Sequence, residues 1–194
     1  AVDRLSGGRL GYVHISSMDD PSFRSVYADI LGKYNDREGI VIDTRFNGGG
    51  RLHEDIEILF SGKKYFTQVV RGREACDMPS RRWNKPSIML TCEANYSNAH
   101  GTPWVYQHQG IGKVVGMPVP GTMTSVSWET LQDPTLYFGI PIVGYRLPDG
   151  SYLENKQLEP DVKIANSPEK IIKGEDEQLE TAVKELLKEI DSKK

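Results

Sequence analysis

Residues 87–104 read SIMLTCEANYSNAHGTPW, and this stretch sets the expected architecture of the chain. The apolar run at 87–90 predicts a buried strand, and residues 99–110 predict a helix in spite of the proline within them. Residues 95–98, Asn-Tyr-Ser-Asn, then form the turn between strand and helix. A serine on such a turn exposes its hydroxyl, and the N–H groups just after it point toward whatever the hydroxyl attacks. Ser97 is therefore a candidate nucleophile.

Ser97 also has a purely structural interpretation. A serine in front of a helix commonly accepts a hydrogen bond from the first helical N–H groups and so caps the helix. Taken without further context, the residues favour this capping role over catalysis.

Three successive glycines at 48–50 form a second informative stretch. They follow residues 39–44, GIVIDT, a continuous apolar run suited to a central strand that is covered on both faces. Glycine allows positive φ and lets another backbone or a ligand approach closely. The loop is therefore either ordinary irregular structure or a nest of N–H groups that binds an anion, such as an oxyanion hole. It is not a P-loop, because no Gly-Lys-Ser/Thr follows it.

Further elements alternate along the chain and predict a single α/β domain over residues 1–194. Helices are expected from Asp20-Pro21 through residue 34, at 52–60, and in the amphipathic stretch at 179–190. Strands are expected at 9–16, 64–70, 112–116 and 136–145, the last of them followed by a Pro-Asp-Gly hairpin turn at 148–150. The polar residues 72–85 predict a long surface loop, and residues 117–124 predict an irregular one.

Bulk composition excludes several classes of function. The net charge of −3 leaves no basic footprint for nucleic acid, and no apolar run approaches the roughly 20 residues of a membrane span. The two cysteines, Cys76 and Cys92, make neither a disulfide framework nor a metal site, and both are expected to be small buried side chains. A start at Ala1, followed almost at once by a strand, suggests an excised domain or a processed product.

Four parts of the chain, in order, resemble one family of serine peptidases. They are SGGRLGYVHISSM at 6–18, GIVIDTRFNGGG at 39–50, MLTCEANYSNAHG at 89–101, and LENKQLEPDV at 153–162 with GEDEQLETAVKEL at 174–186. Together they are similar to the C-terminal processing and tricorn-type peptidases over nearly the whole chain. The resemblance implies an α/β fold of the Clp/crotonase-like kind, a spiral of β-β-α units. It also implies that PDZ and helical domains precede this catalytic domain in a longer protein.

The same resemblance assigns roles to individual residues. It implies that Ser97 is the nucleophile and that Glu154 orients and charge-stabilises a catalytic histidine. It also implies that N–H groups of Gly49 or Gly50, and of Asn98, form the oxyanion hole. No metal or cofactor is required, and the substrate would be a peptide or an unfolded protein. On the residues alone, an exposed surface acid is the commoner explanation of Glu154.

The way in which the serine is activated divides this family. Tail-specific members resemble one another in placing a lysine in a glycine-rich loop after the serine. Here that loop is VGMPVPGTMTS at 115–125, where Thr122 or Met123 holds the expected place and Lys113 lies too early. A Ser–Lys dyad is therefore not expected, and the tricorn-type combination of serine, histidine and glutamate is.

The histidine of the tricorn-type branch belongs to a helical segment upstream of the PDZ domain. The four histidines of this chain, His14, His53, His100 and His108, lie in no matching motif. Because a serine without a base is a poor nucleophile, the isolated chain is expected to be inactive or nearly so. His53, beside the glycine loop, and His100, on the predicted helix, are the local alternatives. Tricorn-type relatives can form large assemblies, so a homo-oligomer is also an expectation.

Two other classes of function stay open. The domain could bind peptides without cleaving them, since one fold hosts many functions. A crotonase-like acyl-CoA enzyme would use the glycine loop to hold a thioester enolate and a glutamate as its base. A serine at the strand-to-helix turn favours the peptidase.

Overall fold

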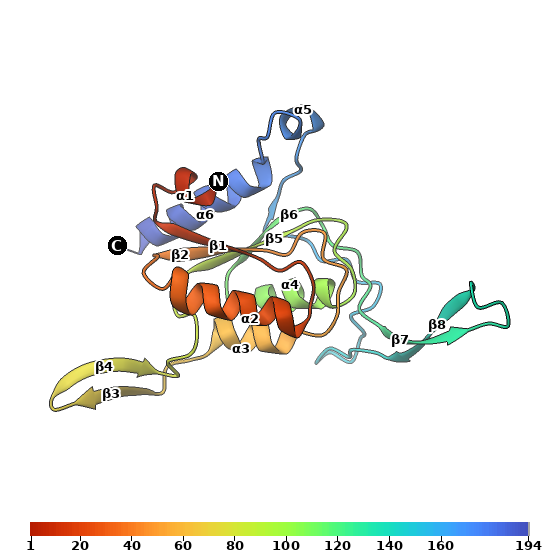
Figure 1. Ribbon diagram of the computed structural model, residues 1–194, viewed down its shortest axis with the longest axis horizontal. Helices are drawn as coiled ribbons and strands as arrows, with labels where there is room; N and C mark the ends of the chain where they lie inside the picture. Colours follow the sequence, from red (N-terminus) through yellow and green to blue (C-terminus); the bar gives the residue numbers. More distant parts are fainter. Residues whose placement is uncertain (194) are drawn as a thin grey trace.

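Five parallel strands form the central sheet of the computed structural model, which describes residues 1–193 (Figure 1). In spatial order they are β1 (Leu10–His14), β2 (Gly39–Asp43), β5 (Ser87–Thr91), β6 (Lys113–Gly116) and β9 (Val162–Lys163). Every neighbouring pair is parallel. The carboxyl ends of parallel strands lie at one edge of the sheet, where α/β proteins commonly build their sites. The glycine loop after β2 and the Ser97 turn after β5 therefore meet at this edge.

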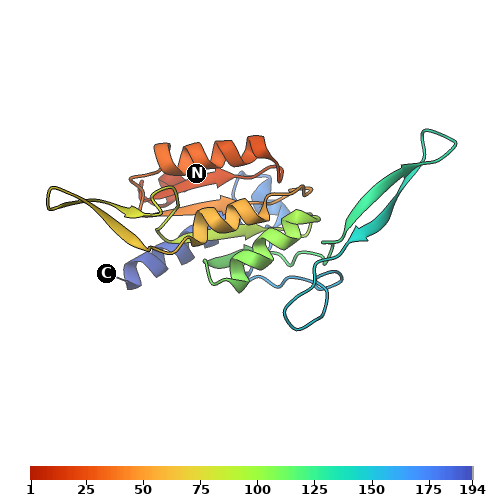
Figure 2. The ribbon, with the colours of Figure 1, turned by 90° about the horizontal axis from the view of Figure 1, so that it is seen from below.

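Helices cover both faces of the sheet (Figures 1 and 2). One layer holds α2 (Asp20–Ala28), α3 (His53–Ser61) and α4 (Asn98–His108), and the other holds α1 (Val2–Leu5) and α6 (Glu177–Ser192). The strands β2 and β5 are buried at every residue, because their side chains alternate between these two layers. The continuous apolar runs of the sequence predicted this double burial, and the structure confirms it.

The first long helix begins one residue earlier than predicted. Asp19, not Asp20, is the N-cap, because its carboxylate accepts a hydrogen bond from the Ser22 N–H at 2.9 Å. After α2 the chain continues as a π-helix, η1 (Asp29–Lys33), so helical structure reaches the predicted region around residue 34. A short helix, α5 (Pro168–Ile171), precedes α6.

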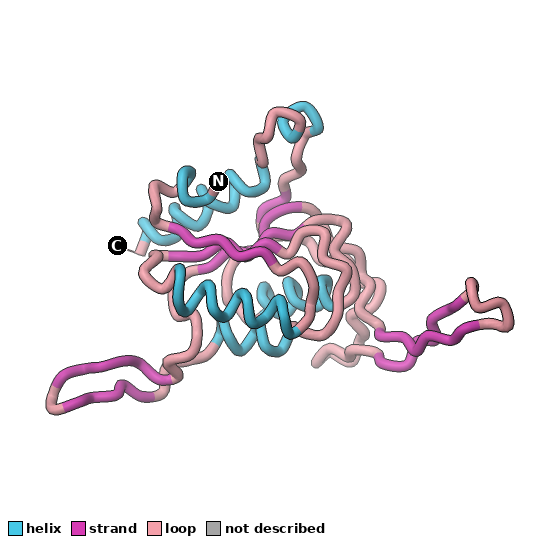
Figure 3. The backbone as a smooth tube through the Cα atoms, in the orientation of Figure 1, coloured by secondary structure: helices cyan, strands magenta, loops and turns pink. Residues whose placement is uncertain are grey.

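Two antiparallel hairpins project from opposite ends of the molecule (Figure 3). One consists of β3 (Phe66–Val70) and β4 (Arg73–Met78), the other of β7 (Ser125–Thr130) and β8 (Tyr137–Val143). The prediction of a surface loop over 72–85 is wrong for β4. Arg71 and Gly72, with φ of 51° and 79°, form a tight turn that pairs the polar β4 with β3. β7 was not predicted either, whereas β8 and the turn at 148–150 are confirmed.

The remaining helices are short or amphipathic. Within residues 1–193, none combines the length and the apolar character that a membrane-spanning helix needs.

Candidate active site

Ser97 lies on the sharp turn between β5 and α4, as predicted. Its backbone adopts φ of 55° and ψ of −120°, a strained conformation for a residue with a side chain. Ser97 occupies the N-cap position of α4, but its side chain accepts no capping hydrogen bond. The capping interpretation of this serine is therefore wrong. The turn is half-exposed, and no described residue hydrogen-bonds to the Ser97 hydroxyl.

Buried asparagines hold this turn in place. The side chain of Asn95 donates to Thr44 Oγ1 at 3.0 Å and to the Ala99 carbonyl at 3.3 Å. The Tyr96 N–H donates to the Asn47 carbonyl at 3.0 Å. These bonds tie the serine turn to the end of β2 and to the glycine loop, so the strained conformation is supported from both sides.

The glycine loop packs directly against Ser97. Gly49 and Gly50 have φ of 99° and 136°, in the region that only glycine adopts readily. A β-carbon added at Gly49 would lie 2.7 Å from the Ser97 β-carbon and 3.2 Å from the Asn98 nitrogen. Close backbone approach therefore requires glycine at position 49.

The two glycines differ in whether their N–H groups are available. The Gly49 N–H donates to Asn47 Oδ1 at 2.8 Å, while the Asn47 amide nitrogen donates to the Ile15 carbonyl at 2.7 Å. Gly49 is thus not a free donor in this conformation. Among residues 1–193, the Gly50 N–H has no acceptor. It points away from Met18, because the isolated parallel bridge between Met18 and Gly50 is made by the Gly49 carbonyl and the Arg51 N–H on either side of Gly50.

Asn98 is buried and connects the serine turn to α3. Its Oδ1 accepts hydrogen bonds from the Leu52 and His53 N–H groups at 2.8 and 3.1 Å, and its Nδ2 lies 2.7 Å from His53 Nδ1. The backbone N–H of Asn98 has no acceptor within the described part of the chain. Gly50 and Asn98 are therefore the predicted donors whose N–H groups are free beside Ser97.

His53 is held in one neutral form. Two backbone donors fix the orientation of the Asn98 amide, so Nδ2 donates to His53 Nδ1 and the ring proton sits on Nε2. Burial lowers the pKa of His53, which also favours the neutral ring. With Nδ1 occupied and Nε2 protonated, the ring has no lone pair left to accept a proton from Ser97.

The imidazole rings of the other three histidines do not hydrogen-bond to the Ser97 hydroxyl among the described residues, although the His100 backbone N–H donates to the Ser97 carbonyl at 2.8 Å. His100 is fully buried, and neither ring nitrogen has a hydrogen-bond partner among the described residues. Burial lowers the pKa of His100, and the Lys156 backbone and the Glu154 carboxylate offset this only in part. His108 stacks on Trp104 at the far end of α4, and His14 is exposed at the end of the edge strand β1.

Glu154 lies beside the same loops as Ser97. Its Oε2 accepts a hydrogen bond from the Thr124 N–H at 2.6 Å. Partial burial would raise the pKa of Glu154, but hydrogen bonds from the Thr124 and Met123 backbone outweigh it and hold the pKa below its usual range. The carboxylate is therefore ionised at neutral pH and fixed by the chain.

The irregular loop at 117–124 connects Ser97 to Glu154. The Ser97 N–H donates to Thr122 Oγ1 at 3.3 Å, and the Asn155 N–H donates to the Gly121 carbonyl at 2.9 Å. Thr122, one of the two residues that the resemblance to tail-specific peptidases puts in the place of a lysine, thus contacts the backbone of the candidate nucleophile. Lys113 pairs with Glu185 at 2.7 Å elsewhere on the surface, so it does not contact the site.

A buried ion cluster behind the glycine loop was not foreseen from the sequence. Arg45 donates to both oxygens of Asp43 and to both oxygens of Asp176, at 2.7 to 2.9 Å. Tyr12 donates its hydroxyl hydrogen to Asp43 at 2.9 Å. Asp176 is also the N-cap of α6, so the cluster anchors the start of the glycine loop to that helix. Asp43 and Arg45 lie far from Asp176 in the sequence, and no local pattern indicates that they pair.

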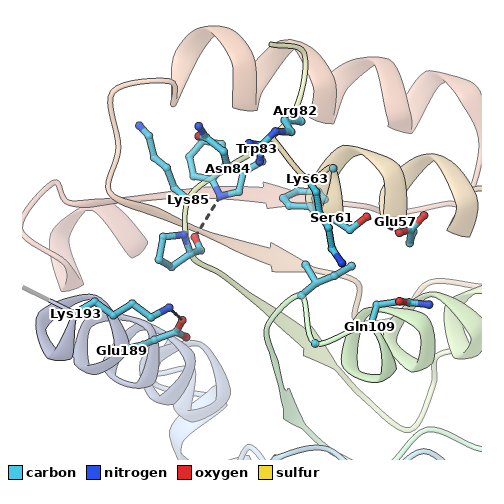
Figure 4. A pocket seen from close by; sticks show the side chains of 15 residues that line it. Glu57, Ser61, Lys63, Arg82, Trp83, Asn84, Lys85, Gln109, Glu189 and Lys193 are labelled. Atoms are coloured by element: carbon cyan, nitrogen blue, oxygen red, sulfur yellow. Dashed lines mark hydrogen bonds and ion pairs between the residues drawn. The ribbon is translucent and has the colours of Figure 1, made fainter. Parts of the chain in front are cut away.

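Cavities do not all belong to this site. One of about 590 Å³ lies at the amino ends of β5 and β6, lined by residues such as Glu57, Trp83 and Lys85, and thus at the opposite end of the sheet from Ser97 (Figure 4). Another, of about 370 Å³, adjoins the glycine loop between Phe46 and Met117. Cys92 lines it and is buried as expected, accepting a hydrogen bond from the Phe46 N–H at 3.2 Å. The same expectation is wrong for Cys76, which is exposed because it lies on β4 of a projecting hairpin.

Comparisons with known proteins show which family the chain resembles in sequence and in fold. Residues 9–164 match the sequence model of peptidase family S41. The tricorn protease homolog 1 of Streptomyces coelicolor is 28% identical over 187 residues, which cover 94% of this chain and 17% of that protein. The tricorn protease of Thermoplasma acidophilum is 25% identical over 190 residues, covering 97% and 18% respectively. A crystal structure of the tricorn protease superposes with a TM-score of 0.84 at 24% identity, covering 98% of this chain and 19% of that one.

The chain thus spans about a fifth of the length of the curated relatives that it matches. Its α/β fold with a parallel sheet matches solved structures of such peptidases, and most of its length lies within one family model. The chain therefore belongs to peptidase family S41 and is tricorn protease-like.

Proposed function

We propose that residues 1–194 are the catalytic domain of a serine peptidase, with the Clp/crotonase-like spiral fold, and that Ser97 is its nucleophile. The observation that carries this proposal is the backbone of Ser97 at φ of 55°, without any capping bond from its side chain. Strain of this kind, at one edge of a parallel sheet, keeps the hydroxyl free for attack on a bound carbonyl.

The oxyanion hole consists of the N–H groups of Gly50 and Asn98. Both lack an acceptor in residues 1–193, and Gly49 brings the loop into contact with the serine turn. Donors that are already fixed in place stabilise the developing negative charge, each contributing about 3–4 kcal/mol in other hydrolases. Asn47 occupies the Gly49 N–H and so selects Gly50 as the donor of this loop.

The general base is a histidine from outside residues 1–194. This part of the proposal rests on the surroundings of the four histidines in the chain, because no imidazole ring among the described residues hydrogen-bonds to the Ser97 hydroxyl. Glu154, ionised and fixed by Thr124, orients that histidine and stabilises its protonated form. Helical and PDZ domains that precede this domain in a longer polypeptide supply the histidine.

The reaction follows from these assignments. A peptide binds in extended form near the glycine loop, and the histidine takes the Ser97 hydroxyl proton as the oxygen attacks the scissile carbonyl. The tetrahedral oxyanion is held by Gly50 and Asn98, the histidine gives its proton to the leaving amine, and an acyl-enzyme forms. Water, deprotonated by the same histidine, then releases the acid and restores the serine.

Peptide hydrolysis by a longer polypeptide that includes the upstream domains tests the proposal. Ser97→Ala should abolish hydrolysis with little change in melting temperature, since the side chain makes no hydrogen bond. Retained turnover would remove Ser97 from the role of nucleophile. Glu154→Gln should lower kcat sharply, whereas Glu159→Gln, an exposed acid on the same segment, should leave it unchanged. Equal effects of the two variants would make Glu154 a structural residue.

A further inference from the structure

The ribbon formed by β7 and β8 reaches far from the rest of the molecule (Figures 1 and 2). No residue between Ser125 and Val143 is buried, yet many of the side chains are large and apolar. Trp128, Tyr137 and Ile142 are 65%, 67% and 63% exposed. A two-stranded ribbon is only marginally stable in water, and contiguous exposed apolar surface marks a site of interaction. This ribbon therefore has the character of a binding surface.

The ribbon is continuous with the candidate active site. Thr122, whose hydroxyl accepts from the Ser97 N–H, and Thr124, whose N–H donates to Glu154, directly precede β7. Just after β8, Tyr145 packs edge-on against His53 with ring centroids 6.1 Å apart. A chain lying along β7 toward its amino end therefore arrives at Ser97.

Two features of the ribbon indicate what it binds. Its only charged residues are Glu129 and Asp133, and it contains no lysine or arginine. Asp133 accepts hydrogen bonds from Thr135, so Glu129 is the acid left for a partner. Pro141 lacks an N–H and interrupts β8, whereas β7 has no proline, which leaves β7 the better edge for an added strand.

We propose that the β7–β8 ribbon is an exosite that binds unfolded polypeptide segments combining apolar and basic residues. The segment adds as a strand to the free edge of β7, its apolar side chains contact Trp128 and Tyr137, and a lysine or arginine faces Glu129. Occupancy of the ribbon delivers the following residues of the substrate to Ser97. This inference rests on the proposed peptidase function, because it concerns how that same site selects its substrate.

The β3–β4 hairpin provides a matched control. It also exposes apolar side chains, among them Tyr65 and Phe66, which are 60% and 67% exposed. However, it projects from the opposite end of the molecule (Figure 3). Arg71 lies in the turn between its strands, and Arg73 begins β4. Replacing Tyr65 and Phe66 by alanine therefore removes exposed aromatic side chains, as the ribbon substitutions do, but at a place remote from Ser97.

Fluorescence anisotropy on the Ser97→Ala chain tests the exosite without any hydrolysis. The probes are two labelled 15-residue peptides with the same apolar residues, one carrying lysines and the other glutamates. Trp128→Ala with Tyr137→Ala should weaken binding of the lysine peptide about five- to tenfold, and Tyr65→Ala with Phe66→Ala should leave it unchanged. Glu129→Lys, which preserves the apolar surface, should reverse the preference between the peptides. Equal affinities in all variants, or no binding of either peptide, would overturn the proposal.

Light scattering on the same variants distinguishes a second occupant. If the ribbon substitutions convert a dimer into a monomer, the surface belongs to another copy of the chain and the exosite is refuted. Peptide binding is measured without a nucleophile, so its loss or retention is independent of whether Ser97 is catalytic.

Discussion

Gly49 lies so close to Ser97 that a β-carbon on the glycine would stand 2.7 Å from that of the serine. The two residues are far apart in sequence, on loops that follow different strands, and each has positive φ. Their contact brings the glycine loop and the serine turn into one unit. The geometry of the candidate oxyanion hole therefore depends on the absence of a side chain at Gly49.

Gly49→Ala should destabilise the protein and distort the serine turn. Positive φ alone costs about 1–2 kcal/mol for a residue with a side chain, and overpacking adds about 1–3 kcal/mol. Gly72→Ala is the control, because Gly72 also has positive φ but no atom lies within 4 Å of an added β-carbon. Urea unfolding should show a clearly larger loss of stability for Gly49→Ala. Equal losses of unfolding free energy in the two variants would mean that the serine turn shifts to accommodate a β-carbon at position 49 without cost.

Asp176→Asn should loosen the anchor of the glycine loop. Asp176 is 30% exposed and binds Arg45, which is 11% exposed, so a partly buried charge would lose one of its two carboxylates. Breaking a fully buried pair costs about 3–5 kcal/mol, and the partial exposure of Asp176 reduces the expected loss to about 1–3 kcal/mol. Asp149→Asn, in an exposed and longer ion pair of 3.9 Å, should change the unfolding free energy by less than about 0.5 kcal/mol. If Asp176→Asn leaves the unfolding free energy unchanged, this cluster does not stabilise the fold.

The Glu177 carboxylate should titrate unusually low. Hydrogen bonds from Lys170 and Ser167 lower the pKa of Glu177 to about 2. A folded-state pKa below the unfolded one means that Glu177 stabilises the fold above the usual glutamate pKa of about 4.3, and that this contribution is lost as pH falls toward 2. Carbon-detected NMR titration of the Glu177 carboxylate should place its midpoint near 2, and Lys170→Met should raise it. A midpoint in the ordinary range would contradict the contacts around α5.

His53 should be neutral and protonated on Nε2. Asn98 Nδ2 donates a hydrogen bond to His53 Nδ1, and the ring is partly buried. Both features oppose the addition of a second proton to the ring. Asn98→Asp keeps an acceptor for the Leu52 and His53 N–H groups but replaces the donor with a carboxylate, so the pKa of His53 should rise. Nitrogen-15 NMR of the ring reports both the tautomer and the titration. A doubly protonated or Nδ1-protonated ring in the wild type would reopen His53 as a candidate base.

Sequence patterns predicted the elements that pack into the core. The runs at 39–44 and 87–90 carry consecutive apolar residues, Ile40 to Ile42 and Ile88 to Leu90, because β2 and β5 are covered on both faces. Hairpin strands were harder, since no residue of β4 or β7 is buried, so neither strand carries the periodicity of burial. Their pairing depends on a turn and a partner strand rather than on the core.

The candidate site was predictable only in outline. The strand-to-helix turn and the glycine loop indicated Ser97 and a set of nearby N–H groups. Which amide stays free depends on the Asn47 side chain, which accepts from Gly49 and leaves Gly50 unpaired. The role of Asn98 in fixing His53 likewise depends on a contact between the first residues of α4 and α3, which lie far apart in sequence. No local pattern encodes such side-chain hydrogen bonds.

Fluorophosphonate labelling with peptide mapping tests the central claim most directly. The label should appear on Ser97 in a longer polypeptide that includes the upstream domains, and should be absent from residues 1–194 alone, because only an activated serine reacts. Label on Ser97 in the isolated chain would contradict an external base, and His53 and His100 would then need replacement one at a time. No label on Ser97 in the longer polypeptide would contradict the assignment of Ser97 as the nucleophile.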